Sequence, residues 1–260
     1  MERQHDASPG CPGPTAAAVA ALVLAERHGM CLAGDAFGEL NDFAYQGDLS
    51  EVIVGSLHWL AERQNADGGW GEPGSGSTVE ATLFARIAIQ LTGVPACYAD
   101  LESRADGFLR GLTHGPNLLK RMGRHEARAY PLIGACAAVG LTPWSHVSRG
   151  WLWRTIRGAS GAGVAQRPAV IAAALARWRM SSHLASVRRT VGRSVEPRLL
   201  TRLTSQQSPT GVFANSLSET ALVVMLLTSA GLRRTQAVQR GVDALLASIQ
   251  PDGCWPEAAV

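Results

Sequence analysis

Apolar residues recur at helical spacing along most of the chain, in stretches of two alternating kinds. Stretches of the first kind are rich in Ala and Leu with few charges, as expected for helices that are buried on every side. They lie at 15–27, 78–91, 126–139, 166–177 and 216–230. The stretches of the second kind are more amphipathic and are predicted to face outward. They lie near 50–64, 100–113, 144–157, 183–205 and 235–249. The pattern predicts an all-α protein made of inner and outer helices in pairs.

Three outer helices end in a similar sequence: a Gln, a turn that contains Gly, and an aromatic residue two positions after that Gly. The copies are Gln64–Trp70, Gln207–Phe213 and Gln250–Trp255. Gly permits the positive φ angle that ends a helix, Gln can satisfy unpaired backbone groups there, and the aromatic ring can cover the corner. We therefore expect these Gln and aromatic residues to belong mainly to the scaffold.

The two ends of the chain indicate how the pairs are arranged. The first apolar helix, Thr15 to Arg27, has no outer helix before it, and the chain stops after an outer helix and its turn. Pairing the first helix with the last would close a ring. We expect one α/α toroidal barrel of about five to six helix pairs over 15–260, preceded by a disordered or extended segment, 1–14. Five pairs are clear, and a sixth could lie within 35–48 or 178–215.

Composition narrows the class of protein. Hydrophobic residues make up 46% of the chain and charged residues 17%, which is typical of a globular protein. No run of eighteen apolar residues occurs, and the start of the chain does not resemble a signal peptide. The five cysteines are scattered without a CxxC motif, which argues against a disulfide framework or a zinc site. We expect a cytoplasmic protein.

Between residues 127 and 195 there is no Asp or Glu, while ten arginines and four of the seven tryptophans occur. Three interpretations remain open: a solvated outer face, peripheral contact with the inner face of a membrane through 144–157, or arginines such as Arg167 that bind a diphosphate. Nucleic acid is not an expected partner, because no binding module accompanies the basic stretch.

The segments Gln64–Trp70 and Gln250–Trp255 resemble the QW motif of squalene-hopene cyclases and related class II terpene cyclases. The protein prenyltransferase β subunits share the barrel of that family. The resemblance extends over about 50–260 and implies an α/α barrel, a polyisoprenoid substrate and an apolar central cavity. The zinc ligands of the prenyltransferases have no match among the seven histidines, which do not cluster with a Cys and an Asp.

In the cyclases, a DxDDTA motif at one end of an inner helix supplies the proton. The matching segment here, Ser216 to Ala221, keeps the Thr-Ala but has Ser216, Ser218 and Glu219 in place of the three Asp. No DxDD or DDxxD motif occurs in the chain. Counted from Ser77, Glu80 has the same offset as Glu219 counted from Ser216, so we expect the two glutamates to be equivalent.

We expect Glu219 or Glu80 to be the catalytic acid. Glu80, Glu126 and Glu219 all lie near the N-termini of inner helices and would gather at one end of a barrel. An apolar cavity raises the pKa of a carboxyl, which could then protonate an alkene or an epoxide with Ser218 orienting the proton. The alternative is that these residues are ordinary first-turn acids that stabilise their helices.

The candidate substrate-binding residues are polar groups near that end and aromatic rings that would stabilise carbocations. They are Ser216, Phe84, Tyr130, Phe213, Trp70 and Arg167. Two functions are left open: a terpene cyclase-like enzyme with a noncanonical acid, and a non-catalytic barrel that binds isoprenoids. Neither needs a cofactor, except that Mg²⁺ would be expected with a diphosphate substrate.

Overall fold

The fold is known from a computed structural model. It describes residues 10–30, 49–72, 74–93, 98–112, 118–119, 122, 129–160, 167–180 and 185–258, without the side chains of 159–160 and 185–194. Each main element within these ranges is a helix, so the all-α prediction is confirmed. The predicted helices 126–139 and 144–157 begin a few residues later than expected, at Tyr130 and Arg149.

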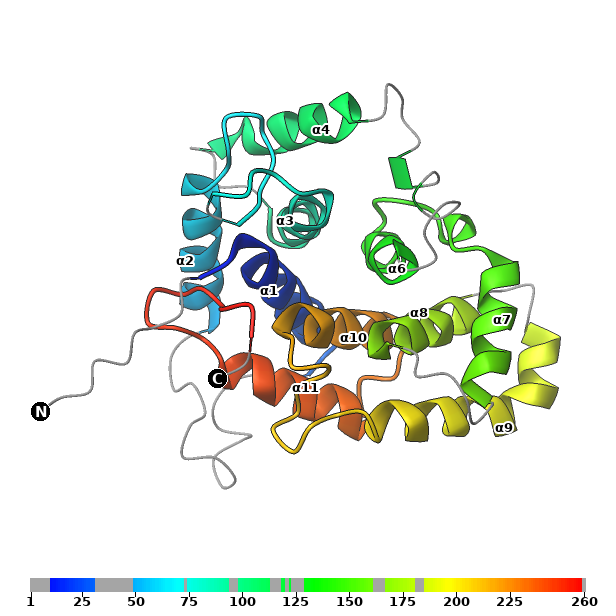
Figure 1. The fold of residues 1–260 in the computed structure, drawn as a ribbon. Helices are drawn as coiled ribbons and strands as arrows, with labels where there is room; N and C mark the ends of the chain where they lie inside the picture. Colours follow the sequence, from blue (N-terminus) through cyan, green and yellow to red (C-terminus); the bar gives the residue numbers. More distant parts are fainter. Residues whose placement is uncertain are drawn as a thin grey trace, which may run out of the picture.

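The helices alternate between the middle of the molecule and its periphery, as the hydrophobic pattern predicted (Figure 1). The inner helices are α1 (Pro12–Arg27), α3 (Val79–Thr92), α6 (Tyr130–Ala138), α8 (Pro168–Arg179) and α10 (Leu217–Ser229). The outer helices are α2 (Leu49–Glu62), α4 (Leu101–Gly111), α7 (Arg149–Ser160), α9 (Ala185–Thr204) and α11 (Gln236–Ala247), and a 3₁₀ turn, η4 (Trp144–His146), precedes α7.

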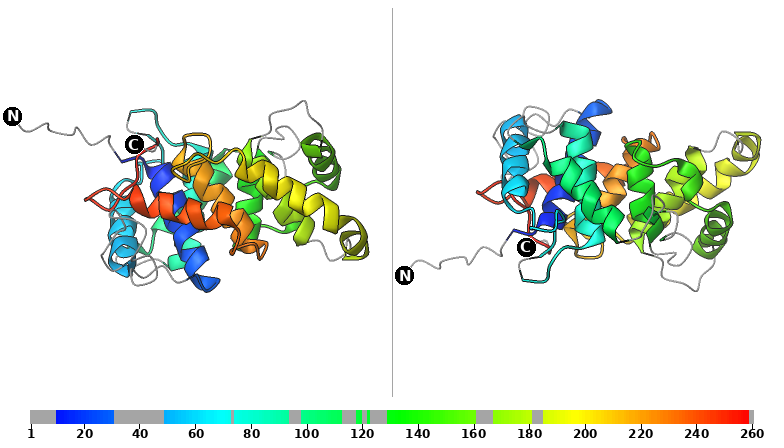
Figure 2. Two further views of the ribbon diagram at one scale, coloured as in Figure 1. Left: turned by 90° about the horizontal axis from the view of Figure 1, so that it is seen from below. Right: turned by 90° about the horizontal axis from the view of Figure 1, so that it is seen from above.

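The inner helices pack directly on one another. Helix α1 contacts α3 on one side and α10 on the other, while α10 also contacts α8 and α6. Alanines allow the close approach, since Ala16–Ala18 on α1 and Ala172–Ala174 on α8 have no accessible surface. The other views show the same central layer with the outer helices around it (Figure 2).

The expected apolar hollow at the centre is not what these helices form. A side chain that lines an open space keeps some accessible surface, whereas Val223–Leu227 in the middle of α10 have none. Across the described inner helices, apolar side chains are packed against each other, because α6 reaches α10 directly and Gly134 lets the two backbones approach at Leu226. The interior is a packed core.

The Gln-turn-aromatic sequences are scaffold, as predicted. The Gln64 amide donates to the Gly68 carbonyl in its own turn at 2.9 Å and to the Leu101 carbonyl at the start of α4 at 3.0 Å. Gln207 makes the equivalent bonds to Gly211 and to Ala237 of α11. Each Gln thereby ties the end of one outer helix to the beginning of the next.

The aromatic residue of each turn is held by the inner helix that follows. The Trp70 backbone N–H donates to the Thr82 hydroxyl at 3.0 Å, and the Phe213 N–H donates to the Thr220 hydroxyl at 2.9 Å. The same contact joins the two ends of the chain, because the Trp255 N–H donates to the Thr15 hydroxyl of α1 at 3.0 Å. The turn that ends at Trp255 therefore contacts α1 in the same way as the turns that end at Trp70 and Phe213 contact α3 and α10.

The contact between the Trp255 turn and α1 includes residues close to the N-terminus. Helix α1 begins at Pro12, and the Cys11 N–H donates to the Trp255 carbonyl at 3.0 Å. The prediction that 1–14 is disordered or extended was therefore wrong for residues 12–14, which are helical, whereas Cys11 is extended; residues 1–9 lie outside the described part. The possible sixth pair within 35–48 also lies outside it, and the described residues of 178–215 contain the end of α8 and one further helix, α9.

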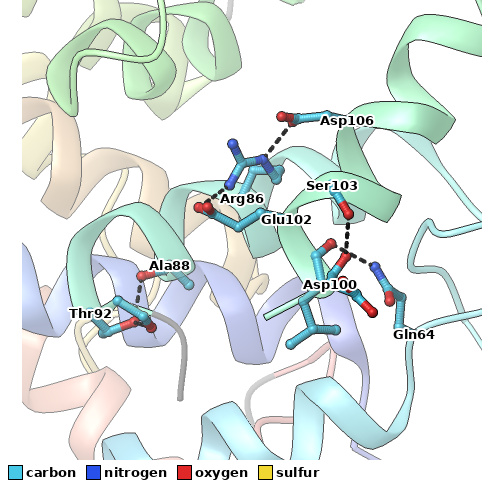
Figure 3. A network of polar contacts seen from close by, with 10 residues as sticks. Gln64, Arg86, Ala88, Thr92, Asp100, Glu102, Ser103 and Asp106 are labelled. Atoms are coloured by element: carbon cyan, nitrogen blue, oxygen red, sulfur yellow. Dashed lines mark hydrogen bonds and ion pairs between the residues drawn. The ribbon is translucent and has the colours of Figure 1, made fainter. Parts of the chain in front are cut away.

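A buried arginine links an inner helix to its outer neighbour (Figure 3). Arg86 of α3 donates to Glu102 at 2.6 Å and to Asp106 at 2.9 Å, both on α4. The Arg86 side chain is only 11% exposed, so the two carboxylates compensate a charge that would otherwise be costly to bury. The network fixes the position of α4 on α3.

The arginines and tryptophans of the acid-free stretch are partly internal. Trp151 is buried against Tyr130, and Trp153 packs edge-on against Trp178 of α8. Among the side chains of α7 that the structure describes, the exposed ones are Arg149, Arg154 and Arg157. The tryptophans of α7 thus contribute to the packing of the protein and do not form an exposed aromatic face. Among the described helices, none has the length and apolar character needed to cross a membrane.

Candidate functional site

A cavity of about 460 Å³ opens where the N-terminal ends of α1, α3, α8 and α10 meet. These ends come together because the four inner helices run in the same direction. The opposite ends also meet, since Arg27 of α1 donates to the Leu91 carbonyl of α3 and Arg179 of α8 donates to Ala230, next to α10. The side chains of four helix starts are therefore brought to one place.

Most of the candidate site residues predicted from the sequence line the cavity. Six of the nine candidates line it: Glu80, Phe84, Arg167, Ser216, Ser218 and Glu219. Its lining is mixed, with carboxyl and hydroxyl groups beside Ala81, Phe84 and Leu222. The structure thus places the predicted acids beside the predicted serines, in surroundings more polar than the apolar cavity that we expected.

Glu219 is the most enclosed of the carboxyl groups, with its side chain 1% exposed. One carboxylate oxygen accepts a hydrogen bond from Arg167 at 2.5 Å. The other accepts from the backbone N–H of Ala169, in the first turn of α8, at 2.9 Å. Both donors complement negative charge, and a helix N-terminus is where a carboxylate is stabilised. Glu219 therefore acts as an acceptor that joins α10 to α8.

Glu80 has different surroundings. Its side chain is exposed in the cavity and has no hydrogen-bond partner among the described contacts. Burial among the surrounding protein atoms raises the pKa of Glu80, the positive charge of Arg167 opposes that change, and the negative charge of Glu219 reinforces it. The environment of Glu80 therefore favours its protonated form.

Glu80 and Glu219 are not equivalent positions, so this part of the sequence prediction was wrong. Thr78 and Ser216 are the equivalent helix caps, since each hydroxyl accepts the backbone N–H three residues later, from Ala81 and Glu219. Glu80 therefore corresponds to Ser218, and Glu219 corresponds to Ala81. The sequence prediction aligned Ser77 with Ser216, whereas the structure aligns Thr78 with Ser216. A displacement of one residue along a helix rotates the side chain by about 100° around the helix axis.

Three of the predicted aromatic residues do not reach the cavity. Trp70 and Phe213 have no accessible surface, and Trp70 donates its indole N–H to the Leu60 carbonyl at 2.8 Å. Tyr130 packs on Trp151 with ring centres 4.5 Å apart. These three rings pack in the corners and the core, and their contact with a substrate stays a prediction. Phe84 alone among the predicted aromatics borders the cavity.

Sequence reasoning missed two carboxyl groups of the cavity, Glu72 and Glu257. Each lies two residues after the aromatic of a turn, Trp70 or Trp255. This repeated spacing was a usable signal. Burial raises the pKa of Glu257, and the nearby charges of Glu72 and Glu80 add to the increase. Glu126, which was expected at the same end, lies outside the described residues.

Among the described residues, the lining of the cavity is rich in carboxyl groups. It includes four glutamates and one arginine, Arg167, which is paired with Glu219. Within the described ranges, no group of three His, Cys, Asp or Glu side chains is placed to hold a metal ion. No protein-family model and no curated protein matches this chain.

Proposed function

We propose that this protein is a terpene cyclase-like enzyme in which Glu80 donates the proton that starts cyclisation of a linear isoprenoid. The observation that carries the proposal is the position of Glu80 in the cavity, where burial raises its pKa. A carboxyl whose pKa is raised keeps its proton to a higher pH than an ordinary Glu and can act as a general acid. Glu219, the alternative acid, is held by Arg167 and Ala169.

The proposed reaction is balanced without a cofactor. The π electrons of an alkene take the proton from Glu80, which leaves a carboxylate and a carbocation. A second alkene of the same chain attacks the cation and forms a carbon–carbon bond. Loss of a proton from carbon to a carboxylate or to water then gives a cyclic alkene, so the product is an isomer of the substrate.

The helix arrangement supports the resemblance to barrel cyclases. Inner and outer helices alternate along the chain, and the Trp255–Thr15 contact joins the last turn to the first helix. We propose that these five pairs form a small closed α/α toroid. Because its centre is packed, the substrate would enter from the Glu80 end and occupy the cavity there.

The charges of the cavity favour a substrate without a diphosphate group. The carboxylate of Glu72 would repel an anion, protonated Glu80 offers it no positive charge, and Arg167 is paired with Glu219. The Mg²⁺ ion that a diphosphate would require is therefore not part of the proposed mechanism. Phe84, Leu222 and Ala81 supply the apolar surface for the hydrocarbon.

The test is incubation with linear isoprenoids from C10 to C30, with and without diphosphate, and mass spectrometry of the products. We expect an isomeric cyclic product from an uncharged substrate. Glu80→Gln is expected to reduce its yield by about 10²-fold or more, since the acid is lost. Glu62→Gln, at an exposed position on α2, is the matched control and should leave the yield unchanged. Full activity of Glu80→Gln would exclude Glu80 as the acid.

The second candidate is a non-catalytic protein that binds isoprenoids. It is favoured by the contacts of Glu219, which explain this residue as a link between α10 and α8 without any role in catalysis. This function predicts saturable binding of an isoprenoid with recovery of the unchanged ligand. Binding that Leu222→Asp abolishes, with no isomer formed at any pH from 5 to 8, would support it over the enzyme.

A further inference from the structure

Arg167 lines the same cavity as the two carboxyls that the proposed function distinguishes. It is the residue before α8, and its guanidinium group donates to Glu219 of α10 at 2.5 Å. Its side chain is 61% exposed, whereas that of Glu219 is 1% exposed. The guanidinium group therefore covers a buried carboxylate from the side of the cavity.

We infer that Arg167 is a positioning residue: by pairing with Glu219 it makes that carboxylate a fixed acceptor and leaves Glu80 as the carboxyl that carries the transferable proton. The inference rests on the proposed function only in naming Glu80 as the acid of a reaction. The division of roles between the two carboxyls is a property of the unliganded protein and can be measured without a substrate.

The charged groups on each side of the cavity support this division of roles between Glu219 and Glu80. Helix α10 contributes Glu219, the residue before α8 contributes Arg167, and the turn after α2 contributes Glu72. The C-terminal segment contributes Glu257, while α1 adds only Gly13 and Pro14, which carry no charge. Among the described residues of the lining, Arg167 is therefore the one cation beside four carboxyl groups.

Two substitutions should move the titration of Glu80 in opposite directions. Arg167→Gln removes the positive charge that lowers the pKa of Glu80, so this pKa should rise. Glu219→Gln removes the negative charge that raises the pKa of Glu80 and leaves the positive charge of Arg167 that lowers it, so this pKa should fall. Arg167→Lys keeps the charge and should stay closer to the parent protein than Arg167→Gln.

The experiment is a ¹³C NMR titration of the full chain labelled at the glutamate carboxyl carbon. The resonance of Glu80 is identified by its loss in Glu80→Gln. Arg154→Gln, which removes an exposed arginine on α7, is the matched control and should leave the titration unchanged. Circular dichroism of each variant verifies that it is folded, and Arg167→Met, which also removes the positive charge, serves if Arg167→Gln is not folded.

A Glu80 titration that is the same in the parent, Arg167→Gln and Glu219→Gln would overturn the inference. Shifts in the same direction in both variants would overturn it as well. Absence of turnover with every isoprenoid would reject the proposed enzyme but would leave the titration result standing. If there is turnover, the pH above which it declines should rise in Arg167→Gln and fall in Glu219→Gln, because the reaction needs protonated Glu80.

Discussion

The two glutamates at the start of α3 and α10 show how neighbouring groups determine the role of a side chain. Glu219 is enclosed and satisfied by two donors, so it stabilises the junction of two helices. Glu80 lies in the same cavity without such donors, and its raised pKa means that the folded protein binds its proton more tightly than the unfolded chain does. A group of this kind lowers stability at neutral pH and is available for chemistry.

The first prediction is that Glu80→Gln increases the free energy of unfolding at pH 7. Because its pKa is raised on folding, Glu80 lowers stability as the pH rises from the ordinary Glu value through its folded value, and the loss then stays constant. Urea unfolding should show a variant more stable than the parent at pH 7 and equal to it at pH 3. Glu62→Gln should match the parent at both values. A less stable Glu80→Gln at pH 7 would contradict the assignment.

Replacing Glu219 should have the opposite effect on the free energy of unfolding at pH 7. Glu219→Ala removes the acceptor of Arg167 and of the Ala169 N–H, and we expect a loss of about 1–3 kcal/mol in the free energy of unfolding at pH 7. The same urea experiment measures it. Stability within a few tenths of the parent would mean that the Glu219 contacts do not hold α10 to α8.

At the scale of the helices, small residues determine how closely the layers approach. Gly241 of α11 faces α10 so closely that an added Cβ atom would lie 2.8 Å from a methyl carbon of Val224. Gly107 of α4 is exposed and would meet nothing within 4 Å. The two glycines have the same low helix propensity but differ in the space around them.

Replacing each glycine by alanine separates these effects. Gly107→Ala should stabilise the protein by about 0.5–1 kcal/mol, because alanine favours the helix. Gly241→Ala gains the same propensity but crowds Val224, so it should be about 1–3 kcal/mol less stable than Gly107→Ala. Thermal unfolding of the two variants measures the difference. Equal stabilisation by both would show that α11 can move away from α10 at little cost.

At the scale of the whole molecule, the ends of the chain are joined by the same contacts that join its repeats. Trp255 has no accessible surface and donates its indole N–H to the Leu245 carbonyl at 2.8 Å, as Trp70 does to Leu60. Its backbone N–H bonds to Thr15, 240 residues away. Trp255, five positions before residue 260, thus belongs to the central structure.

Trp255→Ala should therefore cost as much as Trp70→Ala, about 3–5 kcal/mol in the free energy of unfolding. Denaturant unfolding of both variants followed by circular dichroism is the measurement. A near-neutral Trp255→Ala beside a costly Trp70→Ala would show that the C-terminal turn is not an integral part of the fold.

Local sequence determined the helices, their inner or outer character and the three turns. Hydrophobic periodicity and the Gln, Gly and aromatic residues act within one or two turns of the chain, so they can be recognised without knowing what packs against them. The pairing of the first helix with the last turn could also be predicted, because an unpartnered apolar helix needs a neighbour. The spacing that places Glu72 and Glu257 after their tryptophans was visible in the same way.

Only the tertiary structure decided the chemistry of the cavity. Arg167 and Glu219 are 52 residues apart, and nothing local indicates that they pair. Whether the centre is hollow depends on how closely alanine-rich helices approach, and whether an aromatic ring meets a substrate depends on which corner it fills. The exposure and charge of Glu80 follow from four elements that meet at one end, so its role depends on contacts between residues far apart in the chain.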